Sequence, residues 1–168
     1  MTSFEELYRT YYARVYGFLF KLCRDEGLAE ELTQETFFQA YSALPRYRGE
    51  CGVYTWLASI AKHTYYKYLR RRKAGLEATD LDAIADRVAA WEDTPEEQVE
   101  RDAVKDAVKK VVRKLPEKYS DVVMLRVYAE LPFREIAESL KISENSAKVI
   151  YFRAKKMLME ELSHEFTV

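Results

Sequence analysis

The stretch FREIAESLKISENSAKVIYF, residues 133–152, decides the fold of the C-terminal part of the chain. Apolar residues lie on both sides of a short break in the pattern, at Ile136, Leu140 and Ile142. Ala137 is small enough for a second helix to cross the first closely, and Ser143 is a favourable N-cap for that helix. We therefore predict helices over 133–140 and 144–162 with a tight turn between them, which is a helix-turn-helix.

The turn and the second helix of this motif suit contact with DNA. Lys141 takes the turn position usual for glycine, although a left-handed backbone costs a non-glycine residue about 1–2 kcal/mol. The free amides at the start of the second helix suit a phosphate or a base edge in the major groove. From this segment alone, an ordinary tight helical hairpin is an alternative. As a DNA reader, the helix would use its cap and outer face: Ser143, Ser146, Lys148, Val149, Phe152, Arg153 and Lys156.

The N-terminal part of the chain has the apolar spacing of a three-helix domain. Apolar residues three and four positions apart predict helices over 4–22, 28–44 and 53–73. Gly27 breaks the pattern between the first two helices, and Pro45 ends the second. Residues 46–52, RYRGECG, form a loop with two glycines. Short connections of this kind predict a compact helical domain.

The composition favours an all-α protein of two small domains. The 168 residues include only 5 Gly and 4 Pro, and no strand is needed anywhere. Ahead of the helix-turn-helix we expect a helix over 99–112 and another that has Pro116 in its first turn and ends near Tyr128. We predict a domain over 1–75, an acidic linker over 76–98 and a helix-turn-helix domain over 99–168.

The charge distribution supports this division. The net charge of −1 hides a block over 45–75 with 8 basic residues and 1 acidic residue, followed by 76–103 with 2 basic and 10 acidic residues. A basic block of this kind is typical of a surface that binds nucleic acid.

Several classes of protein do not fit the sequence. Cys23 and Cys51 form no CxxC pair, and the other metal-binding side chains needed for a zinc site would have to come from two histidines, His63 and His164. No catalytic constellation or glycine-rich phosphate loop is present, so we expect no enzymatic activity, no cofactor, no metal and no small-molecule substrate. The N-terminus lacks a signal peptide and no apolar run is long enough to span or insert into a membrane, so we expect a cytoplasmic protein.

The third helix ends in KHTYYKYLRRRK, residues 62–73, where basic and aromatic residues alternate. One face is predicted to carry Lys62, Tyr66, Arg70 and Lys73, with His63, Lys67 and Arg71 beside it. Basic groups hold phosphates and aromatic rings stack on unpaired bases. A solvated basic helix end is the alternative, and it accounts less well for Tyr66 on the polar face.

The second helix has an acidic face with an aromatic residue in it. Glu31, Gln34, Glu35 and Phe38 share this face, while Phe37 belongs to the inner stripe. An exposed Phe among acidic and amide groups indicates a protein interface. An ordinary polar face with one stray Phe is equally compatible with the pattern.

These features occur in the order and spacing of the extracytoplasmic-function sigma factors of bacterial RNA polymerase. Residues 28–73 resemble the family's second conserved region, with LTQETF, the RYRG loop and TWL. Residues 115–162 resemble its fourth region, and the resemblance covers most of the chain except the linker. It implies a factor that binds core RNA polymerase and promoter DNA, and that an anti-sigma factor holds inactive.

The resemblance also implies a role for each surface. The LTQETF helix would dock on the clamp helices of the largest polymerase subunit through Glu31, Gln34, Glu35 and Phe38. The helix-turn-helix would read the −35 element. The loop and third helix would capture the melted −10 element through Arg48, Cys51, Lys62, His63, Tyr66, Lys67, Arg70 and Arg71.

Two departures from the family's pattern and one alternative function accompany this resemblance. Lys141 replaces the common turn glycine. Val149, Ile150 and Tyr151 stand in the recognition helix where relatives often carry polar or basic residues, so the promoter sequence does not carry over. The alternative is a one-component regulator with a helix-turn-helix and a sensing domain. Such a regulator would need a ligand pocket, and it would usually dimerise to read paired half-sites.

Overall fold

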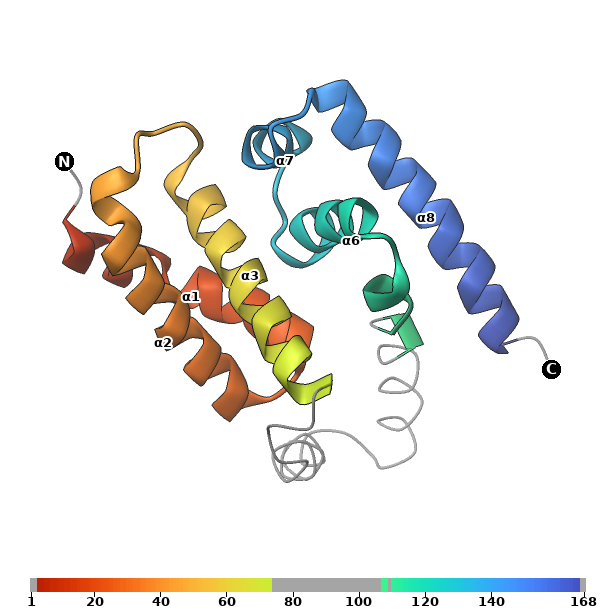
Figure 1. Cartoon of the computed structure of the whole chain (residues 1–168), viewed down its shortest axis with the longest axis horizontal. Coiled ribbons are helices and arrows are strands. Elements are labelled where there is room, and N and C mark those ends of the chain that lie inside the picture. Colours follow the sequence, from red (N-terminus) through yellow and green to blue (C-terminus); the bar gives the residue numbers. More distant parts are fainter. Residues whose placement is uncertain (1–2, 74–106, 109, 167–168) are drawn as a thin grey trace. The chain divides into compact units, whose positions relative to one another are not determined.

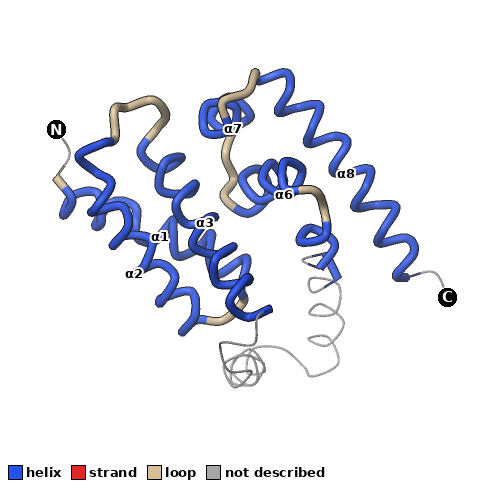
Figure 2. Tube along the Cα trace, viewed as in Figure 1, coloured by secondary structure: helices blue, strands red, loops and turns tan. Residues whose placement is uncertain are grey.

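A computed structural model describes residues 3–73, 107–108 and 110–166, and all of its regular elements are helices (Figures 1 and 2). The chain divides into two compact units, Met1–Ala89 and Ala90–Val168, which are treated separately below. The predicted linker over 76–98 and the first part of the helix predicted over 99–112 lie outside the described residues. The all-α prediction is confirmed, while the exact domain boundaries stay predictions.

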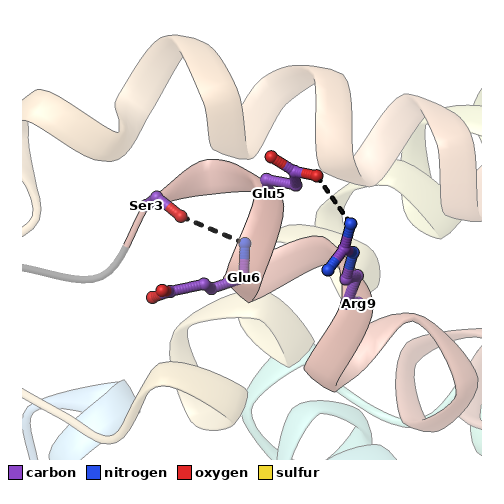
Figure 3. Close-up of polar contacts among 4 residues, drawn as sticks. All are labelled: Ser3, Glu5, Glu6 and Arg9. Carbon is purple, nitrogen blue, oxygen red and sulfur yellow. Dashed lines mark hydrogen bonds and ion pairs between the residues drawn. The ribbon is translucent and has the colours of Figure 1, made fainter.

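The first helix, α1 (Phe4–Cys23), begins and ends at residues with clear capping roles. The Ser3 hydroxyl accepts a 3.2 Å hydrogen bond from the Glu6 amide, which is one of the unsatisfied donors of the first turn (Figure 3). One turn further on, Arg9 Nη2 lies 2.8 Å from Glu5 Oε1. The helix ends at Arg24, which has the left-handed backbone (φ 58°, ψ 27°) common at such positions.

The second helix, α2 (Glu26–Ala43), starts earlier than the sequence predicted. The Asp25 side chain accepts a 3.2 Å hydrogen bond from the Leu28 amide and so caps the helix. Gly27 therefore lies inside the first turn, where one glycine is tolerated, and the predicted break at Gly27 is wrong. A short 3₁₀ turn, η1 (Leu44–Arg46), follows at Pro45, and α3 (Val53–Lys73) comes after the loop.

The core of the first unit lies where α1, α2 and α3 pack together (Figure 1). The large buried side chains come from all three helices: Leu7, Phe18, Leu22, Phe37, Leu57 and Tyr65. The hydroxyls of Thr33 and Thr36 are buried on α2, and each donates to the backbone carbonyl four residues earlier. These two hydroxyls therefore lie in the core without being left unsatisfied.

The second unit consists of helices around the predicted helix-turn-helix. Helix α6 (Glu117–Val123) continues into η3 (Met124–Tyr128), whose wider π turns include a 3.0 Å bond from the Ala129 amide to the Met124 carbonyl. Pro116 precedes α6 at the N-cap instead of lying in its first turn. Helices α7 (Phe133–Leu140) and α8 (Glu144–Phe166) follow, and both pack on the rest of the unit.

No helix within the described ranges is both long enough and apolar enough to cross a membrane.

Candidate nucleic-acid and polymerase interface

The turn between α7 and α8 has the geometry of a helix-turn-helix. Lys141 takes the left-handed conformation, with φ 58° and ψ 46°, and the Ile142 amide donates a 3.0 Å hydrogen bond back to the Ala137 carbonyl. The Ser143 hydroxyl accepts from the Ser146 amide at 3.1 Å, as expected of the predicted N-cap. The buried alanines Ala137 and Ala147 allow the two helices to approach closely. The predicted motif is confirmed, including its strained lysine.

A chain of aromatic contacts holds α8 against α7. The Arg126 guanidinium lies 4.3 Å from the centre of the Phe133 ring and donates a 3.1 Å hydrogen bond to the Leu131 carbonyl. Phe133 in turn meets Tyr151 edge-on, with ring centroids 5.4 Å apart. Tyr151 therefore packs toward α7, so one of the three unusual residues of the recognition helix serves packing.

The outer side of α8 carries the residues predicted to read DNA. All seven are exposed: Ser143, Ser146, Lys148, Val149, Phe152, Arg153 and Lys156. Phe152 is the least covered of the apolar ones, at 61% of its surface. Asn145 is also exposed on the first turn of this side, and sequence reasoning missed it. Its position in the first turn after the Ser143 cap could have indicated a role in DNA contact, since asparagine pairs well with adenine in the major groove.

The loop before α3 is braced from inside by two aromatic residues. The Tyr47 hydroxyl donates a hydrogen bond to the Cys51 carbonyl across the loop. The centroids of the Tyr47 and Trp56 rings lie 4.7 Å apart. Burial, and to a lesser extent the neighbouring Cys51, raises the pKa of the Tyr47 hydroxyl above the ordinary tyrosine value near 10. Gly49 has φ 75°, a conformation that favours glycine. Sequence reasoning did not single out Tyr47, whose ring stack depends on the folded loop.

The predicted −10 residues of the loop and of α3 differ in how exposed they are. His63, Lys67, Arg70 and Arg71 are exposed, as is Arg48 in the loop, while Tyr66 and Cys51 are half-buried. Lys62 is only 1% exposed, so the prediction that it lies on the outer face is wrong. It directly follows the buried Ala61 and lies four residues after the buried Ala58, which turns it toward the packed side of the helix.

The acidic face of α2 is exposed as predicted. Phe38 has 68% of its surface accessible, and Glu31, Gln34 and Glu35 are exposed around it. Glu35 Oε1 accepts a 3.1 Å hydrogen bond from Gln39 on the next turn. A large apolar side chain that is this exposed to solvent, with acidic neighbours, is typical of a protein interface.

A groove of about 240 Å³ lies between α2 and α3, which run side by side (Figure 1). Glu31 and Glu35 line its α2 wall, and Lys67 and Arg71 line its α3 wall. The other lining residues are Leu28, Leu32, Thr64 and Tyr68. The structure thus brings part of the predicted polymerase surface together with part of the predicted −10 surface.

The described residues contain no cluster of three or more His, Cys, Asp or Glu side chains suited to a metal ion. Cys23 and Cys51 are both half-buried, and neither forms a disulfide.

Comparisons with known proteins identify the family. The family model for sigma-70 region 2 matches residues 7–75, and that for sigma-70 region 4 matches residues 105–158. RNA polymerase sigma factor YlaC of Bacillus subtilis is 30% identical over 96% of this chain and 92% of its own length. The ECF RNA polymerase sigma factor SigM of the same organism is 31% identical over 93% of each chain. The chain belongs to the extracytoplasmic-function sigma factors of bacterial RNA polymerase.

Solved structures of low sequence identity share the fold of this sigma factor. CnrH, in complex with the cytosolic domain of CnrY, matches with a TM-score of 0.60 at 19% identity, over 96% of this chain and 88% of that one. RpoE of Bartonella quintana, in complex with the anti-sigma factor NepR, matches with a TM-score of 0.58 at 18% identity, over 95% and 96%.

Family membership establishes the general function. As a sigma factor, the chain binds core RNA polymerase and directs transcription initiation at specific promoters. Sigma factors regulate transcription and are not enzymes as a class.

Proposed function

We propose that three surfaces of this sigma factor divide the work of initiation. The α7–α8 motif reads the −35 element, the loop 46–52 with the outer face of α3 captures the −10 strand, and the α2 face binds core polymerase. The observation that carries the proposal is the exposure of each surface: bare Phe38 on α2, the cationic residues of α3 and the polar outer side of α8.

At the −35 element, α8 presents its N-terminal residues to the major groove. Ser143 and Ser146 lie at the cap, where amides and the helix dipole suit phosphate. Lys148 and Arg153 follow within the next turns, and Lys148 lies 3.7 Å from Glu144 in an exposed ion pair that water weakens. Val149 and Phe152 supply apolar contact to thymine methyl groups, which is a form of base readout.

At the −10 element, the braced loop receives an unstacked base. Tyr47 connects the two sides of the loop and packs on Trp56, and Gly49 lets the loop backbone turn sharply. Arg48, His63, Tyr66 and Arg70 then hold the strand by its phosphates and by stacking. Lys62 has no part in this surface, because a buried ammonium does not reach a phosphate without rearrangement of the helix.

At the polymerase, the bare ring of Phe38 anchors the contact. Buried aromatic anchors supply most of the binding energy of protein interfaces, and surrounding polar groups set orientation. Glu31, Gln34 and Glu35 surround the ring and favour a basic partner surface.

An anti-sigma factor is the proposed inhibitor of this chain. The two solved structures of similar fold hold their sigma factors in complex with a second protein, which for RpoE is the anti-sigma factor NepR. We also propose that the chain works in the cytoplasm, where sigma factors meet polymerase, and that it catalyses no reaction.

The alternative function, a one-component regulator, is disfavoured by the family match.

Run-off transcription tests the proposed function. The purified chain is added to core RNA polymerase with fragmented genomic DNA of the source bacterium, and transcripts are mapped by sequencing. We expect defined start sites that appear only with the chain present. The same start sites with core alone, or none with the mixture, would reject promoter-directed initiation by this protein.

A further inference from the structure

The α2–α3 groove joins residues that the sequence predicts to bind two different partners. Glu31 and Glu35 belong to the polymerase surface, whereas Lys67 and Arg71 were predicted to bind the −10 strand. All four line one groove, which two buried leucines, Leu28 and Leu32, help to form. A molecule that enters this groove would meet both signs of charge.

A nucleic-acid strand fits this groove poorly. Phosphates drawn to Lys67 and Arg71 would enter a space that also holds the carboxylates of Glu31 and Glu35. A polyanion gains little from two cations placed opposite two anions.

Lys67 and Arg71 lie on a different side of α3 from the other residues predicted to contact the strand. Lys67 and Arg71 are four residues apart and share the α2-facing side with Thr64 and Tyr68, which also line the groove. Arg70 directly precedes Arg71 and is rotated from it by about 100° around the helix. Arg70 is exposed but does not line the groove, and the same holds for His63.

We propose, building on the proposed function, that Lys67 and Arg71 bind core polymerase and not DNA. The groove receives a polymerase segment of mixed charge, with a basic side chain against Glu31 and Glu35 and an acidic side chain against Lys67 and Arg71. This contact continues the surface around Phe38, which lies three and seven residues after Glu35 and Glu31 on the same helix. The polymerase interface thus extends from α2 onto α3.

The test compares two pairs of substitutions on α3 in the full-length chain. Affinity for core polymerase is measured without DNA, by fluorescence anisotropy of the labelled chain. We expect Lys67→Ala with Arg71→Ala to weaken this affinity roughly tenfold or more. At saturating concentration, the same variant should form open complexes on a duplex promoter as well as the wild type does. We expect His63→Ala with Arg70→Ala to show the reverse pattern.

A charge-matched control and a measurement on the native chain complete the design. Lys21→Ala with Arg72→Ala removes two positive charges from exposed positions of the same unit, outside the groove, and should keep core affinity within about twofold. Acetylation of lysines, read by mass spectrometry, should show Lys67 protected when core binds without DNA, whatever the folding of the variants.

The outcomes separate this inference from the proposed function. If core affinity is unchanged by loss of Lys67 and Arg71 while strand opening fails, these residues hold DNA and the inference is overturned. Lys67 that stays reactive in the core complex overturns it as well. If the wild-type chain itself does not bind core, the proposed function fails and the inference fails with it.

Discussion

In the second unit, the aromatic contacts that hold the recognition helix against α7 lie within residues 126–151, from Arg126 through Phe133 to Tyr151. In the first unit, the two walls of the α2–α3 groove come from residues 28–35 and 64–71. The helix-turn-helix is therefore a local structure, whereas the groove exists only when distant segments pack. We expect substitutions to act through single contacts in the first case and through shared surfaces in the second.

The largest expected effect is on the shared surface of α2. Replacing Glu35 by Lys together with Phe38 by Ala removes the apolar anchor and reverses a neighbouring charge, so co-purification with core polymerase should be lost. The helical circular dichroism signal should remain, because Phe38 is exposed and Glu35 lies outside the core. Glu6→Lys on α1 makes the same charge reversal at another exposed position and should leave binding intact. Binding retained by the double variant would remove α2 from the polymerase interface.

A smaller effect is expected for single contacts in the helix-turn-helix. Lys148→Ala or Arg153→Ala should weaken promoter binding by about 1–3 kcal/mol if the side chain reads a base. A phosphate contact would instead weaken binding to all sequences alike and flatten the dependence on salt. Binding titrations at several salt concentrations, with specific and random duplexes, separate the two. If neither substitution changes transcription from a −35-dependent promoter, α8 does not read that element.

The two regions also differ in how much of them could be predicted from sequence. The motif at 133–152 was predicted down to the Ser143 cap and the left-handed Lys141, because each feature depends on neighbours a few residues away. In the first unit, the bare Phe38 was predicted from helical spacing, but the buried Lys62 was not. The burial of Lys62 depends on how α3 packs against the other helices. The 3.6-residue helical period predicts that basic residues share one wide face, but it does not predict which of them lie at the edge of that face, next to the core.

A substitution at Tyr47, which contacts the Cys51 carbonyl and the Trp56 ring, tests whether the −10 loop behaves as a local structure. Tyr47→Phe keeps the ring stack on Trp56 and removes only the hydrogen bond to the Cys51 carbonyl, so we expect a loss of about 1 kcal/mol of stability. The pKa of Tyr47 is raised in the folded chain, so its contribution is complete below the ordinary tyrosine value near 10 and is lost as pH rises through the folded value. Urea unfolding between about pH 6 and 9 should therefore show a constant difference between variant and wild type. A difference that shrinks within this window would show that Tyr47 already ionises there.

The smallest expected effect is a gain, at the turn of the helix-turn-helix. Lys141 has φ 58°, a conformation that costs a non-glycine residue about 1–2 kcal/mol, and its side chain is exposed. Lys141→Gly relieves this cost but gives the unfolded chain more freedom, which offsets about 0.4–1 kcal/mol. The net gain should lie between zero and about 1.6 kcal/mol, seen as a higher urea midpoint and slower hydrogen exchange in peptides that span the turn.

Lys155→Gly is the matched control for this gain, because Lys155 is also an exposed lysine of the same unit but lies inside helix α8. Glycine there should lower stability by about 1 kcal/mol, since the helical backbone gains nothing from its freedom. Opposite signs for the two substitutions would show that the strain at Lys141 is a property of the turn alone. Equal losses would mean that the Lys141 side chain stabilises the turn, and the helix-turn-helix would then depend on more than its local backbone.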